Sequence, residues 1–327
     1  MAIKAVSPKT IEEAAQILRD GGLVGMPTET VYGLAANALN GEAVAKVFEA
    51  KGRPAINPLI VHVYSIDEAA KYVELNDFAR AAAHKFWPGP LTMILPKVQG
   101  CKVSDLASAG LDTLAVRVPA HKVALSLLKG AAVPLAAPSA NKSGSLSPTS
   151  PAHVHDSLGG KVDMILAAGA SSVGLESTVL DLSGEEPVVL RPGGVTAEDL
   201  SEVLGVEVRY ADGDADKPKS PGLLLKHYAP NTKVRLNAVD VDEGEALLAF
   251  GSLKFMGLKQ GGFAKDLPEG RLCNLSDRGD LHEAAANLFA MLKELDKSNA
   301  KAIAVMSIPD EGIGRAINDR LRRAAES

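Results

Sequence analysis

The stretch Leu23-Val24-Gly25-Met26-Pro27-Thr28-Glu29-Thr30-Val31-Tyr32-Gly33 shows the pattern on which the fold prediction rests. A short apolar run, typical of a buried strand, leads directly into a proline and a polar loop. The same order returns several times within the first 200 or so residues. Because loops at strand ends often present side chains to a ligand, the pattern predicts an α/β domain with one composite binding site.

Four further polar motifs follow this one, and most of them also come after an apolar run. They are Lys51-Gly52-Arg53-Pro54 with Asn57-Pro58-Leu59, Pro138-Ser139-Ala140-Asn141-Lys142-Ser143-Gly144, Ser177-Thr178-Val179 and Leu190-Arg191-Pro192-Gly193-Gly194. Cations, hydroxyls, two asparagines and many glycines suit a small anionic ligand, with phosphate as the first candidate. The set does not suit a metal cage or a Ser-His-Asp triad.

Composition limits the classes of function that remain. The 327 residues suggest two domains, and 46% apolar residues are enough for real cores, although an aromatic share of 4% leaves Leu, Val, Ile and Ala to fill them. The formal net charge of -5 argues against tight nonspecific binding of nucleic acid, which needs a basic field. Cys101 and Cys273 lie far apart without a CxxC motif, which predicts neither a zinc knuckle nor a disulfide framework.

The N-terminal stretch Met1–Pro8 lacks the long apolar core of a signal peptide, and the sequence has no run of about 18 apolar residues. We therefore expect a cytoplasmic protein in a reducing compartment, with no membrane contact.

The first part of the chain predicts one mixed α/β domain over residues 1–207. Ser7-Pro8 marks the start of a helix that stops at Gly21-Gly22. Strands are expected at 23–26, 59–63, 91–95, 114–118, 133–137, 162–166, 178–182 and 187–190. Further helices are expected at 42–50, in two stretches up to residue 86, at 121–128 and at 196–204.

Residues 208–232 are predicted to be a linker, because 211–219 are charged, poor in apolar residues and interrupted by Gly and Pro. The following stretch, 220–230, is too apolar for a plain tether and is expected to dock on something. Strands at 246–250, 272–274 and 302–307, with helices at 281–295 and 313–325, predict a small second α/β domain over residues 233–327, with a parallel sheet.

Each motif also has an ordinary structural explanation when it is considered alone. Lys51 and Arg53 suit a solvated helix end, where cations favour the helix dipole, although Asn57 and two prolines predict a rigid loop instead. The stretch 139–144 could be a plain Asn/Ser/Gly turn, or a loop for phosphate or a base edge. Arg191 at a strand end would ordinarily form a surface ion pair.

Other polar residues leave similar alternatives open. Arg117 lies inside the apolar stretch 114–118, so it must face either water at a sheet edge or a partner anion. His62 would by default be a satisfied core histidine. His153 and His155 are two residues apart, but no acid or cysteine completes a metal set.

Negative evidence narrows the chemistry. The sequence has no GxxxxGK[ST], no strand-borne GxGxxG, no HExxH and no GxSxG, so any nucleotide site uses a different cradle. Glu29 and Glu176 could be paired carboxylates, but nothing in the sequence brings them together. Metal ligands therefore stay unassigned.

These motifs, in this order and spacing, closely resemble the threonylcarbamoyl-AMP synthase family in its two-domain form. The resemblance covers essentially the whole chain. It rests on Pro27–Leu34, the Lys-x-Arg pair of Lys51 and Arg53, the Ser-x-Asn pair of Ser139 and Asn141, and Ser220-Pro221-Gly222 with His227-Tyr228-Ala229-Pro230. It implies a twisted, mixed, open sheet with flanking helices (a YrdC-like domain), a linker, and a small parallel-sheet α/β domain.

The resemblance also implies an enzyme, a nucleotidyltransferase of the L-threonylcarbamoyladenylate synthase type. L-threonine, bicarbonate and ATP with Mg²⁺ would give threonylcarbamoyl-AMP and pyrophosphate. A separate tRNA-modifying transferase complex would then place the threonylcarbamoyl group on an adenosine of tRNA, as N6-threonylcarbamoyladenosine. Weak contact with tRNA is a further expectation.

The resemblance carries site residues over position by position. The residues implied to bind ATP are Lys51, Arg53, Asn57, Thr113, Ser139, Asn141, Ser147, Arg191 and Tyr228. The residues implied to bind threonine are Thr30, His62, Arg117, Ala137 and Ser177. Lys51, Arg53 and Arg191 would carry catalysis by neutralising charge on the phosphates. The stretch 220–230 is expected to close as a lid over water-labile intermediates.

Three rival functions remain at this point. A tRNA- or double-stranded-RNA-binding module without chemistry is disfavoured by the acidic net charge. A hydrogenase-maturation carbamoyltransferase would need zinc-finger cysteines and an acylphosphatase-like region, and this chain has neither. A structural scaffold would not explain the Lys-x-Arg and Ser-x-Asn loops together.

Overall fold

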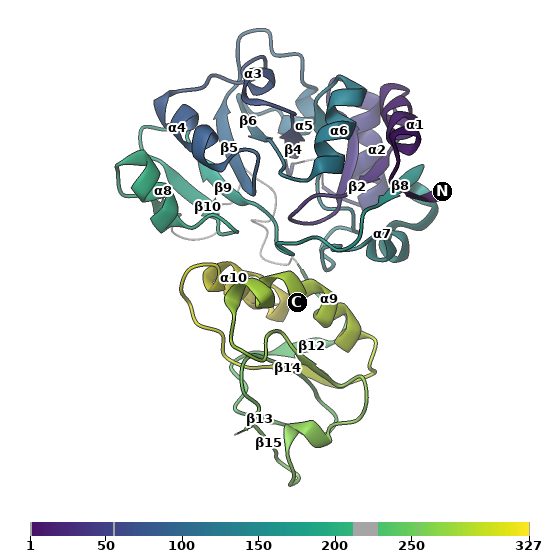
Figure 1. Cartoon of the computed structure of the whole chain (residues 1–327), viewed down its shortest axis with the longest axis vertical. Helices are drawn as coiled ribbons and strands as arrows, with labels where there is room; N and C mark the ends of the chain where they lie inside the picture. The colour runs from purple at the N-terminus through teal and green to yellow at the C-terminus, as the bar shows by residue number, and fades with distance from the viewer. Residues whose placement is uncertain (1, 55, 212–227, 255, 327) are drawn as a thin grey trace. The chain divides into compact units, whose positions relative to one another are not determined.

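The computed structural model describes residues 2–54, 56–211, 228–254 and 256–326, and the chain divides into two compact units (Figure 1). The first unit comprises Met1–Ser143, Pro148–Ser172 and Glu176–Leu224. The second comprises Gly144–Ser147, Val173–Leu175 and Leu225–Ser327. Two short segments that interrupt the first unit in sequence therefore belong to the second unit.

The first unit is built on an eleven-stranded sheet in the order β1-β8-β2-β3-β7-β4-β6-β5-β9-β10-β11. Parallel and antiparallel pairs alternate irregularly across it, which confirms the predicted mixed open sheet. The strands are β1 Ala2–Ala5, β2 Val24–Met26, β3 Gly33–Asn37, β4 Ile60–His62, β5 Leu91–Pro96, β6 Thr113–Arg117, β7 Leu135–Ala136, β8 Met164–Ala167, β9 Thr178–Asp181, β10 Val188–Arg191 and β11 Arg209–Tyr210.

Helices flank this sheet, and their ends follow the predicted signals. Ser7 caps α1 by accepting a hydrogen bond from the Thr10 N–H, and Pro8 takes the first helical position. Thr196 caps α8 in the same way. The helices are α1 Pro8–Arg19, α2 Gly41–Lys51, α3 Ile66–Ala69, α4 Asp77–Phe86, α5 Asp105–Ser108, α6 Lys122–Ala131, α7 Pro151–Leu158 and α8 Ala197–Leu204, with a 3-10 turn η1 at Gly159–Lys161.

Small residues fill much of the core, as the low aromatic share predicts. Ala14 and Ala15 of α1 lie in one buried cluster with Ala124 and Ala131 of α6, and these two helices pack together. Alanine side chains let two helix backbones approach closely. The close approach gives many dispersion contacts without large aromatic side chains.

Some elements were not expected from the sequence. Strand β3 is buried on both faces and reads Gly-Leu-Ala-Ala-Asn, so it has neither an alternating pattern nor β-branched residues. Its pairing with β2 and β7 places it in the sheet instead. Helix α7 does carry a signal, because Ser150 and Pro151 repeat the cap-and-proline start of α1.

The second unit contains a four-stranded sheet in the order β12-β17-β14-β16, in which every pair is parallel. This confirms the predicted small parallel-sheet domain. Its elements are β12 Lys233–Arg235, β13 Asp240–Val241, β14 Ala246–Ala249, β15 Gly257–Leu258, η2 Ala264–Asp266, β16 Leu272–Asn274, α9 Leu281–Asp296, β17 Ala302–Val305 and α10 Gly314–Ala325. Strands β13 and β15 form a separate parallel pair.

The segments Gly144–Ser147 and Val173–Leu175 pack closely within the second unit. Ser145 forms a bridge with Ala229, and the Lys293 ammonium donates to the Leu146 carbonyl at 2.9 Å. Gly174 has a φ of +75°, and a Cβ there would lie 2.5 Å from backbone atoms of α9. Only glycine permits this approach.

The predicted linker lies mostly outside the described residues, because 212–227 are not described. The boundaries at 207 and 232 therefore stay predictions. Within the described ranges, the structure has no helix that is both long enough and apolar enough to cross a bilayer.

Candidate functional site

The predicted Lys-x-Arg and Ser-x-Asn motifs lie together in the first unit. Lys51 ends α2, where Gly52 adopts a left-handed conformation with φ of 61° and turns the chain. The Lys51 ammonium is buried and donates to the carbonyls of Ser139 and Asn141, each at 2.6 Å. The Lys51 carbonyl in turn accepts from the Ser143 N–H at 2.8 Å. These contacts fix the cation against the loop that follows β7.

The environment of Lys51 disfavours its positive charge. Burial holds its pKa well below the ordinary value, the charge of Arg53 lowers it further, and only Glu176 opposes the shift. A bound anion would reverse this imbalance, because it would stabilise the charged ammonium.

Arg53 lies in a rigid loop beside Lys51. Its guanidinium donates to the carbonyls of Asn57 and Pro58, at 3.3 Å and 3.1 Å. Asn57 is 1% exposed, and neither polar atom of its amide has a hydrogen-bond partner within the described residues. A buried amide without partners costs free energy, and this amide can still bond to a ligand group.

Arg191 and Ser177 form the next part of the site. Arg191, the last residue of β10, donates to the Ser177 carbonyl at 2.9 Å and 3.1 Å and to its hydroxyl at 3.2 Å. The Ser177 hydroxyl lies 2.8 Å from that of Thr92 on β5. Glu176, the residue before Ser177, is buried, and its charge raises the pKa of Lys51. The Ser177 loop therefore lies close enough to Lys51 for the two charges to interact.

Arg117 ends β6 and is 3% exposed. Its Nε donates to the Gly89 carbonyl at 3.1 Å, one terminal nitrogen donates to the Thr30 hydroxyl at 2.9 Å, and the other pairs with the Glu29 carboxylate. Of the two alternatives left by the sequence, the structure selects the partner anion. Arg117 does not lie at a sheet edge, because β6 has β4 and β5 on its two sides.

His62 and Ala137 lie next to this cluster. His62 is the register partner of Arg117 in the parallel pair of β4 and β6. Ala137 donates its N–H to the Ile60 carbonyl at 3.0 Å, and the His62 Nδ1 lies 3.3 Å from that same carbonyl. Burial first, and then the charge of Arg117, lower the pKa of His62 to about 3. The imidazole is therefore neutral at physiological pH.

This neutral histidine predicts an acid-sensitive contribution to stability. The unfolded chain takes up a proton below pH 6.5, whereas folded His62 takes one up only near pH 3, so stability falls as pH decreases through this window. Between pH 6 and pH 4, the wild type should lose about 1.4 kcal/mol per pH unit more than His62→Gln. Urea unfolding at each pH measures this difference. His84→Gln, at an exposed position of α4, is the control for replacing a histidine outside the buried cluster.

Hydrogen bonds and neighbouring residues connect Arg117 to Arg191. Arg117 bonds to the carbonyl of Gly89, and the next carbonyl, from Pro90, accepts the N–H of Thr178 at 3.0 Å. Thr178 follows Ser177, which holds Arg191. Hence the predicted threonine-binding residues Thr30, His62, Arg117, Ala137 and Ser177 belong to one connected region with the predicted phosphate-binding arginine.

Three predicted ATP-binding residues are placed less directly. Thr113 begins β6, at the end opposite Arg117, and it is partly exposed. Ser147 is fully buried and belongs to the second unit. Tyr228 also belongs to that unit, where its ring lies 5.5 Å from that of Phe289 and 5.3 Å below the Arg320 guanidinium. Their roles in nucleotide binding stay predictions.

Sequence reasoning did not assign Glu29 and Glu176 to the site. Glu29 is 7% exposed and pairs with Arg117, and its second carboxylate oxygen has no hydrogen-bond partner in the described part of the chain. Its position between Thr28 and Thr30 in the polar loop was the available signal. Glu176 immediately precedes the Ser177 motif, but no spacing could reveal that it acts on Lys51.

The donor set does not form a metal centre by itself. No group of three or more His, Cys, Asp or Glu side chains that could hold a metal ion occurs among the described residues.

Comparisons with protein families cover almost the entire chain. The Sua5_yciO_yrdC family model, described as "Telomere recombination", matches residues 16–193. A second family model, described as "Threonylcarbamoyl-AMP synthase, C-terminal domain", matches residues 195–326. Both models therefore match in the order that the sequence analysis expects.

Curated proteins and solved structures agree with these matches. A threonylcarbamoyl-AMP synthase from Pyrococcus abyssi is 41% identical and covers 96% of this chain and 94% of its own. One from Bacillus subtilis is 39% identical, with 96% and 92% coverage. The crystal structure of P. abyssi Sua5 complexed with L-threonine has a TM-score of 0.87 and 37% identity, and covers 99% of this chain and 96% of its own.

Proposed function

This chain belongs to the threonylcarbamoyl-AMP synthase family, and from that premise we propose that it makes L-threonylcarbamoyladenylate and pyrophosphate from L-threonine, bicarbonate and ATP. The observation that carries the proposal is the connected path from Arg117 to Ser177 and Arg191, together with Glu176, the neighbour of Ser177, which acts electrostatically on Lys51. One region is suited to an amino acid, and the adjoining region is suited to a phosphate chain.

The amino-acid region is organised around Arg117. A guanidinium has five N–H groups, and three of them are used by Gly89, Thr30 and Glu29. The two that remain can bind the threonine carboxylate, as planar guanidinium groups often do. We assign Glu29 to holding the guanidinium in this orientation. The relative from P. abyssi, which was crystallised with L-threonine, supports an amino-acid substrate.

Neutral His62 suits the hydroxyl of threonine. A neutral imidazole has one nitrogen that accepts a hydrogen bond, and the Thr30 and Ser177 hydroxyls lie in the same connected region. With a pKa of about 3, His62 is a weak base, so we give it a binding role rather than a proton-transfer role.

The phosphate region stabilises charge during the transfer. The threonine amine, after losing a proton, attacks carbon dioxide derived from bicarbonate and forms a carbamate. A carbamate oxygen then attacks the α-phosphorus of ATP, and the bond to pyrophosphate breaks. We assign Lys51, Arg53 and Arg191 to neutralising the negative charge that accumulates on the phosphates, so that positioning and electrostatics supply most of the acceleration.

Two further elements of the proposal concern ligands outside the protein. Mg²⁺ is assigned to the phosphates of ATP, since the described residues offer no cluster of metal ligands, and no step here depends on it.

The product is a mixed anhydride that water destroys, so a tRNA-modifying transferase in the cytoplasm must consume it quickly. We propose that 220–230 closes over the site during this time; 220–227 lie outside the described residues.

Pyrophosphate release tests the proposal directly. The full chain is incubated with ATP, magnesium and bicarbonate, with or without L-threonine. Release that requires both threonine and bicarbonate is the expected result, and serine in place of threonine then measures specificity. Release that ignores threonine, or none from folded protein, would refute the assignment.

A further inference from the structure

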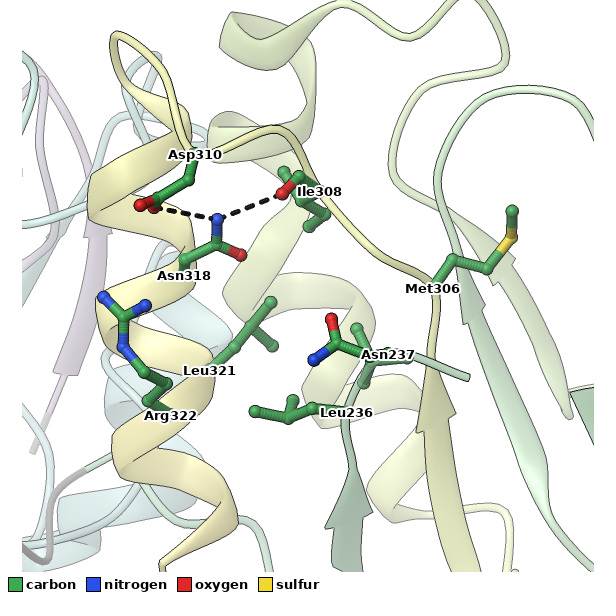
Figure 2. A pocket seen from close by; sticks show the side chains of 9 residues that line it. Leu236, Asn237, Met306, Ile308, Asp310, Asn318, Leu321 and Arg322 are labelled. Carbon is green, nitrogen blue, oxygen red and sulfur yellow. Dashed lines mark hydrogen bonds between the residues drawn. The ribbon is translucent and has the colours of Figure 1, made fainter. Parts of the chain in front are cut away.

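The second unit contains a cavity of about 270 Å³ that the proposed synthase reaction does not use (Figure 2). It lies beyond the carboxyl ends of β12 and β17, which are adjacent and parallel. Leu236 and Asn237 follow β12, Met306 and Ile308 follow β17, and α10 forms the facing wall.

The topology at this point is the one at which open parallel sheets bind small molecules. After β12 the chain crosses β17 to reach β14, whereas after β17 it runs into α10, which packs against β12. The two connections leave in opposite directions, and such a switch point opens a crevice outside the strand ends. The cavity is therefore a consequence of the strand order rather than a packing defect.

Two amide side chains face this cavity from opposite walls. The Asn318 nitrogen donates to the Ile308 carbonyl at 3.1 Å and to the Asp310 carboxylate at 3.2 Å, which leaves its oxygen directed into the cavity (Figure 2). The Asn237 oxygen lies 3.3 Å from the Ser307 hydroxyl, and its nitrogen points into the cavity. One fixed acceptor thus faces one donor across an apolar floor that includes Leu236 and Leu321.

One charge of each sign completes the lining. Asp310 bonds to Asn318, and Arg322 follows Asn318 by one helical turn on α10 (Figure 2). Arg322 is exposed and forms no ion pair with any described residue, whereas its neighbour Arg323 pairs with Asp319 at 3.1 Å. A net charge of zero, divided between two rim groups, matches a zwitterion better than a nucleotide, whose phosphate would meet Asp310.

We infer that this cavity binds a free α-amino acid with an apolar side chain. Arg322 and the Asn237 amide receive the carboxylate, and Asp310 and the Asn318 oxygen receive the ammonium group. The side chain lies on the leucine floor. Binding there would make the state of this unit depend on the concentration of free amino acids. The cavity is separate from the threonine site proposed in the first unit.

Calorimetric titration of the full chain, without ATP, tests this inference. Valine and threonine have nearly the same shape, so the apolar floor should make valine bind more tightly than threonine here, and leucine or methionine should bind comparably to valine. Arg322→Ala and Asn237→Ala, both at exposed positions, should weaken valine binding at least tenfold. The control Arg323→Ala, at the next position on α10, should leave it unchanged.

Each contrary result has a definite meaning. No binding of any apolar amino acid, or binding that Arg322→Ala leaves intact, would overturn the inference. Binding of AMP that depends on Arg322, without amino-acid binding, would replace the ligand class. Because pyrophosphate release is not the readout, failure of the synthase proposal and failure of this inference are distinguishable.

Discussion

Replacing Lys51 with methionine should reduce the rate of pyrophosphate release by about 10²- to 10³-fold at saturating ATP, the usual cost of losing one transition-state donor. Methionine keeps most of the side-chain volume, but it removes the ammonium that the Ser139 and Asn141 carbonyls hold in place. Steady-state kinetics measure the loss. Threonine affinity without ATP should change little, because Thr30, His62 and Arg117 have no bond to Lys51.

Lys46→Met is the matched control. Lys46 lies on the same helix, is exposed, and donates to the Gly21 carbonyl, so its loss should leave the rate near that of the wild type. A Lys51→Met enzyme that kept more than a tenth of the wild-type rate would show that this ammonium does not act on the transferring group.

Replacing Arg117 with methionine should cost both threonine binding and stability. It leaves the Glu29 carboxylate buried without its cation, and breaking a buried pair in this way typically costs about 3–5 kcal/mol. Urea unfolding gives the free energy, and threonine titration gives the affinity. We expect threonine binding to become undetectable at millimolar concentrations, because the carboxylate loses its guanidinium partner.

The double variant Arg117→Met/Glu29→Gln separates these two effects. Removing the orphaned negative charge should recover a substantial part of the lost stability, while threonine binding stays absent. Equal stability of the single and double variants would mean that the Glu29 carboxylate is not destabilised by losing Arg117, contrary to the buried pair described above.

Much of the fold could be predicted because local signals were strong. Ser7-Pro8 and Thr196 mark helix starts through hydrogen bonds that the sequence alone specifies. Strand β14 is a continuous apolar run, and β5 is interrupted only by Thr92. By contrast, β3 and the short β12 are strands only because neighbouring strands pair with them, and that information is distributed over residues far away in the chain.

The candidate site likewise contains residues that the sequence indicated and residues that it did not. Lys51, Arg53 and Arg117 could be named because cations next to glycine, or inside an apolar strand, are chemically conspicuous. The partnership of Glu29 with Arg117 spans 88 residues, and no local pattern encodes it. The amino-acid cavity escaped sequence reasoning for a similar reason, since strand order creates it and its polar side chains are individually ordinary.

The insertion of Gly144–Ser147 into the second unit has a consequence for biosynthesis. Leu146 is translated 147 residues before Lys293, whose ammonium holds its carbonyl. At about 5–20 residues per second, the ribosome needs roughly 7–30 s to deliver that partner. During this interval the Leu146 carbonyl lacks its donor, although Ala229, the bridge partner of Ser145, has already been made. A nascent chain released before Lys293 is made would thus lack a contact that holds this loop, as well as part of the second unit.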